Sequence, residues 1–529
     1  MTEADADADV DVGAPALPSD LWLLLALLAC TVVAGDLAFA LWMTEVRNTC
    51  PAFAEYCSQP GLFTKANQFY QLLMPGILAY VTVDFARRRR CRPLTDQVYP
   101  QAVAVIERLM TELSVRRRPA LLVGRRLGVG AYVTGVPRRP YLVMGADLLV
   151  LAGKGDRQRQ IFEVVVRHEI AHLQGRDLAT TMAVSLLRWS NLYAGAFMIF
   201  AAYLESLSGD TTPAGLGVTL LRVVLFTLLV EMIARAWLRV REHQADLRAG
   251  SADRAGLLAL VEASGGRGGT PRLMSWLRRH PLRADRIGVA FSPRLLLASS
   301  PGRLLLGAIS AGALLPTLQD RFLSGEGTNT DGLILLNGGL VGAALTGYVG
   351  LSLWRHIWFA GGVSWWEVPV TALILAGGIA AGSELAIYST IATDRTGLFR
   401  SPPTFAALLL ATLLICGWLS LTGGLGLRGG TGRIPMFLAV ALPAGCLAGG
   451  GVVAGLWIWA VKLRVVPLVC AEADFGDPGG LCHAGDVQRR VTEAVLATTF
   501  TGPGPVLIAL VAVAAPAILL IVTRAGASR

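Results

Sequence analysis

The sequence predicts an α-helical protein that crosses a membrane about ten times and carries one small α+β domain. Three observations support this fold class. Hydrophobic residues make up 53% of the 529 residues and charged residues only 16%, whereas soluble proteins contain about 25% charged residues. Roughly ten stretches are apolar over the length of about 20 residues that a helix needs to cross a bilayer. One Arg-rich stretch between two of them has the mixed pattern of a folded soluble domain.

The chain begins with an acidic, polar segment, residues 1–20, which we expect to be a disordered tail because it is too poor in apolar residues to fold alone. The predicted spans follow this tail, and they are 21–43, 69–86, 189–206, 216–237, 303–318, 332–354, 366–388, 403–422, 435–462 and 506–523. The spans from 303 onward form a C-terminal membrane domain, 303–529. Its many small residues, as in GGGVVAG (449–455), are typical of closely packed membrane helices.

Charge and cysteine placement predict the orientation of a multi-pass protein of the cell membrane. The basic block RRRRCR (87–92) follows the second span, and the positive-inside rule places it in the cytoplasm. With ten crossings, the loop with Cys50 and Cys57 and the loop with Cys470 and Cys482 both lie outside, where disulfides form. The alternative is that these cysteines are unpaired thiols. The net charge of +10 reflects Arg clusters beside apolar spans, so we predict the lipid bilayer and not nucleic acid as a partner.

The soluble domain begins at the basic block and extends to about residue 185. Residues 98–117 have a helical pattern. Three β-prone stretches, broken by Gly and Pro, follow at 120–124, 130–134 and 140–144. A second helix is predicted over 158–175.

This second helix carries VVVRHEIAHLQGRD (164–177), in which His168, Glu169 and His172 lie behind a run of valines. Positions i and i+4 share one face of a helix, so both imidazoles can bind one metal ion with the glutamate beside them. The chain has only six histidines, which makes an accidental match improbable. The pattern predicts a zinc hydrolase, but a catalytic zinc ion needs a third protein ligand and an open position for water.

A candidate for the third ligand lies where the fourth span continues into AWLRVREHQADLRAG (236–250). Glu242 and Asp246 are one helical turn apart, so Glu242 can bind the ion while Asp246 orients a ligand histidine. His243 is the rival ligand. It lies about 100° around the helix from Glu242, so the two do not both face one ion.

The combination of these segments resembles the membrane zinc metallopeptidases that include HtpX and the CAAX prenyl endopeptidases. The matching text is HEIAHLQGRD (168–177) and REHQADLRAG (241–250). GAYVTG (130–135) with YLVMGADLLVL (141–151) is similar to the family's edge strand and the segment that follows it, and HPLRADRI (280–287) is similar to its late His-Pro segment. The resemblance implies a metallopeptidase module over 21–302, with a zincin-like catalytic domain at the cytoplasmic face formed by 87–185 and 238–302.

The resemblance also implies roles for individual residues. His168, His172 and Glu242 would hold one Zn²⁺ ion, and Glu169 would be the general base that activates water against a peptide bond. The substrate would be a membrane-associated protein or peptide, bound as an added strand. The implied substrate-binding residues are Ala131, Tyr132, Val133 and Arg286. His280 would be catalytic, and Asp177 and Asp246 would support the metal ligands. For His280 and Arg286 the alternative is an ordinary surface helix start with an exposed arginine.

Two other functional classes are compatible with parts of the sequence. A signal transducer of the BlaR type would use a related zinc domain to cleave a repressor, but it requires a large outside sensor domain, and the predicted outside loops are short. A scaffold or transporter with an idle zinc site is the second alternative. The intact set of His168, Glu169, His172 and Glu242 favours the peptidase.

The predicted topology can be tested with reporter fusions after residues 100 and 475. An odd number of predicted spans lies between residues 100 and 475. The two reporters are therefore expected on opposite sides of the membrane. A pair of reporters on the same side would show that the number of crossings is wrong by one.

Overall fold

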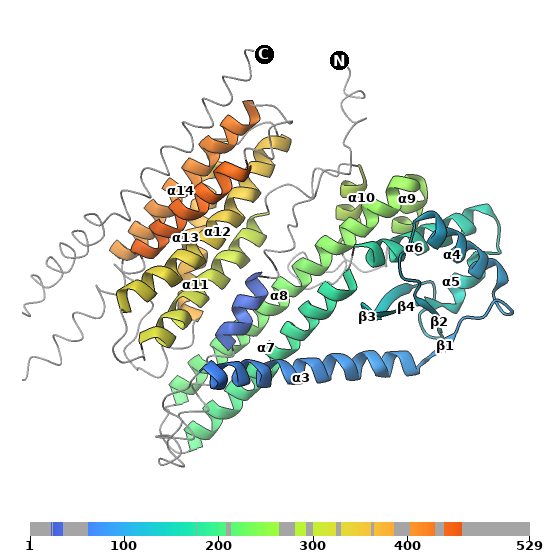
Figure 1. Cartoon of the computed structure of the whole chain (residues 1–529), viewed down its shortest axis with the longest axis horizontal. Coiled ribbons are helices and arrows are strands. Elements are labelled where there is room, and N and C mark those ends of the chain that lie inside the picture. Colours follow the sequence, from blue (N-terminus) through green and yellow to red (C-terminus); the bar gives the residue numbers. More distant parts are fainter. Residues whose placement is uncertain are drawn as a thin grey trace, which may run out of the picture.

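The computed structural model is mostly helical, and a small sheet domain lies at one end of the long helices α3 (Leu62–Arg89), α7 (Asp177–Leu207) and α8 (Pro213–Ala252) (Figure 1). The structure describes residues 23, 25–34, 62–175, 177–207, 213–263, 281–291, 300–323, 330–360, 364–385, 402–428 and 438–456. The predicted tail 1–20, the loops with Cys50, Cys57, Cys470 and Cys482, and the span 506–523 lie outside these residues, so the expected disulfides stay predictions.

The sheet has four strands, β1 (Cys91–Pro93), β2 (Ala120–Gly124), β3 (Ala131–Val136) and β4 (Arg139–Gly145), in the order β1-β2-β4-β3. The three strands predicted from the sequence are confirmed, and β1 is an addition. β2 and β4 are parallel, while the other neighbours are antiparallel. β3 is therefore an edge strand of the sheet in the part of the chain that the structure describes.

Three helices pack against the sheet to form the core of this domain. They are α4 (Pro100–Glu112), α5 (Ala146–Leu151) and α6 (Asp156–Gln174). The core consists of apolar side chains spaced at helical intervals on α4 and α6 and at alternate positions on β4, including Ile106, Leu109, Leu142, Met144, Phe162, Val166 and Ile170. This packing fixes one face of α6 and leaves its opposite side for other contacts.

Long helices connect this domain to the apolar part of the molecule. α3 leads into β1, α7 starts shortly after α6, and α8 follows as one continuous helix of 40 residues. The prediction that the fourth span continues through Glu242 is confirmed. The helix Leu25–Ala34 packs with α7 and α8 in a second core, which also includes Leu306 and Ala313.

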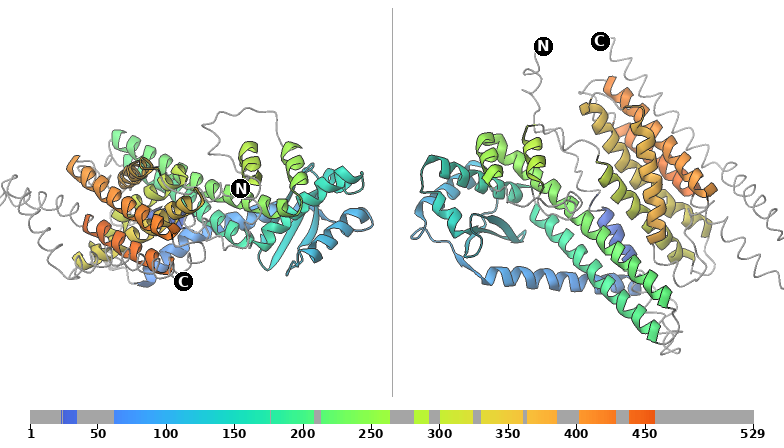
Figure 2. Two further views of the ribbon diagram at one scale, coloured as in Figure 1. Left: turned by 90° about the horizontal axis from the view of Figure 1, so that it is seen from above. Right: turned by 180° about the vertical axis from the view of Figure 1, so that it is seen from behind.

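The C-terminal helices form a bundle on the other side of α7 and α8 from the sheet domain (Figures 1 and 2). Its members are α11 (Pro301–Leu323), α12 (Thr330–Ala360), α13 (Glu367–Leu385), α14 (Pro402–Arg428) and Leu438–Leu456. Small residues allow close packing, as predicted. A Cβ atom on Gly449 would lie 2.0 Å from Thr346 Oγ1, and one on Gly382 would lie 2.1 Å from the carbonyl oxygen of Ile309.

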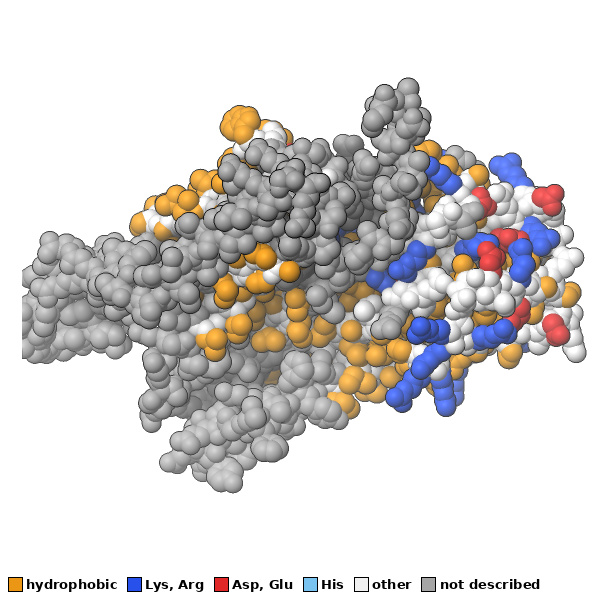
Figure 3. Space-filling model, turned by 45° about the horizontal axis from the view of Figure 1, so that its top comes forward, with side chains coloured by type: hydrophobic (Ala, Val, Ile, Leu, Met, Phe, Trp, Pro, Cys, Tyr) orange, Lys and Arg blue, Asp and Glu red, His pale blue; other side chains and the backbone are white. Residues whose placement is uncertain are grey.

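Four described helices are long and apolar enough to cross a membrane, which indicates a membrane protein. They are Pro213–Ser251, Glu367–Leu385, Pro402–Gly426 and Leu438–Leu456. The expected total of ten spans and the cytoplasmic orientation stay predictions. Charged side chains gather on the sheet domain and hydrophobic side chains on the helices beside it (Figure 3), which is the distribution expected of a domain attached to a membrane bundle.

The core of the sheet domain can be tested by removing one buried side chain. Val105 on α4 is 5% exposed and packs in this core, whereas Val98 before α4 is 65% exposed. Val105→Ala is expected to destabilise the domain by about 1–3 kcal/mol, because it removes buried apolar surface and leaves a cavity. Val98→Ala is the matched control and should leave the thermal unfolding midpoint in detergent almost unchanged. Equal shifts for the two variants would contradict this core.

Candidate metal centre

α6 presents both motif histidines to the same side of the helix. His168 and His172 are one turn apart, their Nε2 atoms lie 3.3 Å from each other, and their rings are nearly perpendicular. His168 is only 8% exposed because the valines before it anchor α6 in the domain core. The helix therefore holds two imidazole nitrogens close enough to share an ion, as the spacing predicts.

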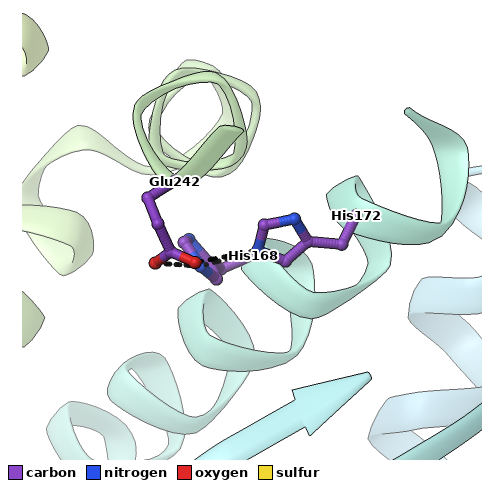
Figure 4. A group of neighbouring side chains, drawn as sticks. All are labelled: His168, His172 and Glu242. Atoms are coloured by element: carbon purple, nitrogen blue, oxygen red, sulfur yellow. Dashed lines mark hydrogen bonds and ion pairs between the residues drawn. The ribbon is translucent and has the colours of Figure 1, made fainter. Parts of the chain in front are cut away.

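Glu242 on α8 reaches the two histidines from the facing helix (Figure 4). One carboxylate oxygen lies 3.8 Å from His168 Nε2 and the other lies 3.8 Å from His172 Nε2. All three ligand atoms lie within 4.8 Å of one another. His243, the rival ligand, is not part of this cluster. Its exclusion follows from its position around the helix relative to Glu242.

Two arginines of α8 hold this helix against the C-terminal end of α6. Arg241 Nη2 donates to the carbonyl oxygen of Gly175 at 2.8 Å, and Arg248 Nη1 donates to that of Ala171 at 3.1 Å. The Gly175 carbonyl lies just past the last residue of α6, where a helix has no internal partner, so the bond from Arg241 satisfies it. The Ala171 carbonyl already accepts from the Gly175 N–H at 2.9 Å, and Arg248 is a second donor to it. Both bonds place Glu242. The arginines lie seven residues apart, two helical turns, and this spacing was a signal that the sequence interpretation did not use.

The donor set fits a zinc ion. In a tetrahedral site with metal–ligand bonds of about 2.1 Å, two ligand atoms lie about 3.4 Å apart. The two histidine nitrogens are 3.3 Å apart, and each lies 3.8 Å from a different oxygen of Glu242. With one ligand atom per residue, the three atoms lie within 4.8 Å of one another, so small side-chain adjustments bring them to this separation. Two imidazoles and one carboxylate are also the protein ligands of a common class of catalytic zinc sites, in which the fourth position is open for water.

The second ring nitrogen of each histidine faces an aspartate. His172 Nδ1 lies 2.8 Å from Asp177 Oδ2, and His168 Nδ1 lies 3.0 Å from Asp246 Oδ1. Asp177 is 4% exposed and Asp246 is 1% exposed. A carboxylate at this position fixes the orientation of a metal-binding ring and keeps the other nitrogen free for the ion. Both aspartates therefore lie where they can orient the histidine rings, and their supporting role stays a prediction.

Each aspartate is paired in turn with an arginine. Asp177 forms an ion pair with Arg241. Asp246 accepts two bonds from Arg286 of α10 (Arg283–Phe291), at 2.7 and 2.6 Å. Each histidine ring thus contacts a carboxylate, and that carboxylate contacts a guanidinium group. A buried carboxylate needs such a counter-charge because burial without one is costly.

Arg286 has a defined partner, which bears on its expected contact with substrate. Burial tends to lower the pKa of its guanidinium group, but the hydrogen bonds and charge of Asp246 outweigh this effect and hold the pKa above its ordinary value. Arg286 therefore stays charged and supports Asp246. A direct contact of Arg286 with substrate or oxyanion stays a prediction. His280 lies outside the described residues.

The remaining predicted site residues lie on α6 and on β3. Glu169 is 7% exposed on α6, between the two histidines in sequence. Ala131, Tyr132 and Val133 begin the edge strand β3, and the side chains of Ala131 and Val133 pack against the core that includes α6. The edge strand is thereby placed beside the helix that carries the histidines.

Comparison with known proteins gives a family match for this part of the chain. The model of peptidase family M48 matches residues 98–292, which include α6, the end of α8 that carries Glu242, and α10. The match confirms the resemblance to the HtpX and CAAX-type metallopeptidases that the motifs indicated. No match was found among curated proteins or among solved structures. The C-terminal bundle lies outside the matched residues.

The support of His172 by Asp177 can be tested through metal affinity. Asp177→Ala removes the carboxylate that faces Nδ1, so zinc affinity is expected to fall about 10- to 100-fold. Competition with a chromophoric chelator measures the change. Asp96→Ala, at an exposed position in the same domain, is the control and should bind zinc like the unaltered chain. An unchanged affinity in Asp177→Ala would show that the contact does not support a metal ligand.

Proposed function

We propose that the chain is a membrane-embedded zinc endopeptidase that hydrolyses peptide bonds of membrane or membrane-associated proteins. The observation that carries the proposal is the meeting of His168, His172 and Glu242, from two helices, within the segment that matches peptidase family M48. The M48 peptidases are zinc enzymes, and the donor set described above suits that ion.

The protein groups divide the chemistry between them. His168, His172 and Glu242 would hold the ion, which when bound supplies a water of lowered pKa and polarises the peptide carbonyl. Glu169 would take the proton of that water as it attacks the carbonyl carbon, and then pass the proton to the nitrogen of the leaving amine. Asp177 and Asp246 would keep the two rings oriented throughout.

The edge strand supports a peptide as the substrate. β3 ends the sheet on the side next to α6 in the described part of the chain, so an extended peptide can add to it as a further strand. Backbone hydrogen bonds supply the affinity in this mode, and they require no particular side chain. The continuous helix α8 supports a location close to the membrane, because one end of it is apolar and the other carries Glu242.

The proposal is tested by separating metal binding from turnover. Glu169→Gln is expected to retain zinc and to lose cleavage of labelled casein in detergent, by at least about 100-fold, because the amide cannot accept the proton. His172→Ala is expected to lose both zinc and cleavage, since it removes a ligand. Zinc content is measured by atomic absorption in both variants.

Glu163→Gln on the same helix is the matched control, because Glu163 pairs with Arg108 and Arg159 at the surface. It should retain both zinc and cleavage. Cleavage that persists in Glu169→Gln, and that also survives removal of zinc by a chelator, would contradict the proposed function.

A further inference from the structure

One face of α3 is bonded to the edge strand. Tyr80, Asp84 and Arg88 follow each other at intervals of four residues, so they lie on one face of the helix. The Tyr80 hydroxyl donates to the carbonyl oxygen of Gly135 at 2.9 Å, and Thr134 Oγ1 donates to Asp84 Oδ1 at 2.6 Å. We call these three α3 residues the latch face.

The contact is buried and reinforced by charge. Asp84 is 5% exposed and Thr134 is 8% exposed. Arg88 pairs with Asp84 at 2.8 Å, and its guanidinium carbon lies 4.8 Å from the centre of the Tyr141 ring on β4. A hydrogen bond to a carboxylate is stronger than one between neutral groups, and here the charge of Arg88 balances that carboxylate. The latch face therefore binds both β3 and β4.

Close packing of an earlier turn of α3 against α7 fixes the position of α3. A Cβ atom on Gly76, one turn before Tyr80, would lie 2.6 Å from the carbonyl oxygen of Leu186 on α7. The absence of a side chain lets the two helices approach closely. Since α7 follows α6 directly, the latch face is held relative to the helix that carries His168 and His172.

The strand register shows which backbone groups of β3 face outward. The Gly145 N–H donates to the carbonyl oxygen of Gly130 at 2.9 Å, so these two residues are a hydrogen-bonded pair. Bonded and non-bonded pairs alternate along an antiparallel ladder. The non-bonded pairs are then Ala131 with Met144, Val133 with Leu142, and Gly135 with Pro140.

Two further features agree with this alternation. Pro140 has no N–H and suits a non-bonded position. The Gly135 carbonyl is bonded to Tyr80 and not to β4. The N–H and carbonyl groups of Ala131 and Val133 consequently point to the open edge, whereas the outward carbonyl of Gly135 already has a partner.

We propose that the latch face positions β3 for peptide binding and ends its usable edge at Gly135, so that a substrate strand pairs with Ala131 and Val133 only. The proposal rests on the proposed function and deepens it. The usable edge covers about three residues, or roughly 10 Å of extended chain. Recognition is thus confined to a short extended segment beside the metal centre, and Tyr80, Asp84 and Thr134 act as positioning residues.

The positioning role is tested with Thr134→Val, Asp84→Ala and the double variant, each loaded with zinc. A fluorogenic peptide that the unaltered chain cleaves serves as the probe. Each single change is expected to raise KM about 5- to 10-fold, because one hydrogen bond that orders the strand is lost, and to change kcat by less than about twofold. The double variant should resemble Asp84→Ala, since both changes remove the same bond.

Hydrogen exchange measured by mass spectrometry gives a readout that is independent of turnover. Without any peptide, residues 129–137 should exchange faster in all three variants than in the unaltered chain. Thr317→Val is the matched control, because among the described residues Thr317 bonds to the carbonyl of Ala313 on its own helix and lies far from β3 in sequence. Unchanged exchange and KM, or strictly additive effects in the double variant, would overturn the positioning role.

The limit set by Tyr80 is tested by peptide length. The fluorogenic peptide is extended by two residues at each end in turn. One of the two extensions runs along β3 toward Gly135. In the unaltered chain this extension should leave KM unchanged, whereas in Tyr80→Ala it should lower KM severalfold. Tyr203→Ala, at an exposed position of α7, is the control. Equal length dependence in Tyr80→Ala and the unaltered chain would overturn the limit, while loss of Glu169 dependence would instead overturn the proposed function.

Discussion

The structure of the site depends on one contact, that of the polar end of α8 with the C-terminal end of α6. α6 carries two candidate ligands and α8 carries the third, so neither helix forms the cluster alone. Arg241 bonds to the Gly175 carbonyl just past the end of α6, where a helix lacks internal partners, and Arg248 adds a second bond to the Ala171 carbonyl. Because α8 is one continuous helix, the position of Glu242 is coupled to the packing of its apolar part against α7 and the helix Leu25–Ala34.

The same contact organises the buried charges around the cluster. Two parallel series run outward from it, His172 to Asp177 and Arg241, and His168 to Asp246 and Arg286. Each carboxylate is shared between an imidazole and a guanidinium group, which compensates for its burial. Farther along α8, Glu231 is bonded to Arg188 of α7 and to Arg235. Ion pairs therefore lie along α8 from the candidate metal centre toward the apolar part of the helix.

Local patterns predicted much of this arrangement. The spacing of His168 and His172 predicted that they share one helix face, and the alternation and turn residues predicted β2, β3 and β4. The separation of Glu242 and Asp246 by one helical turn predicted that both carboxylates lie near the histidines. Contacts between distant segments were not predictable in this way. Thr134 and Asp84 are 50 residues apart, and nothing in the periodicity of either segment encodes their bond. The bond of Arg286 with Asp246 likewise joins α10 to α8 across 40 residues of sequence.

The central claim is that one zinc ion joins α6 to α8, and anomalous diffraction at the zinc absorption edge from crystals of the zinc-loaded chain tests it most directly. The account predicts a single strong peak within about 2.0–2.2 Å of His168 Nε2, His172 Nε2 and a carboxylate oxygen of Glu242. A peak bonded to the two histidines with Glu242 well beyond bonding distance, or a peak at other residues, would contradict it.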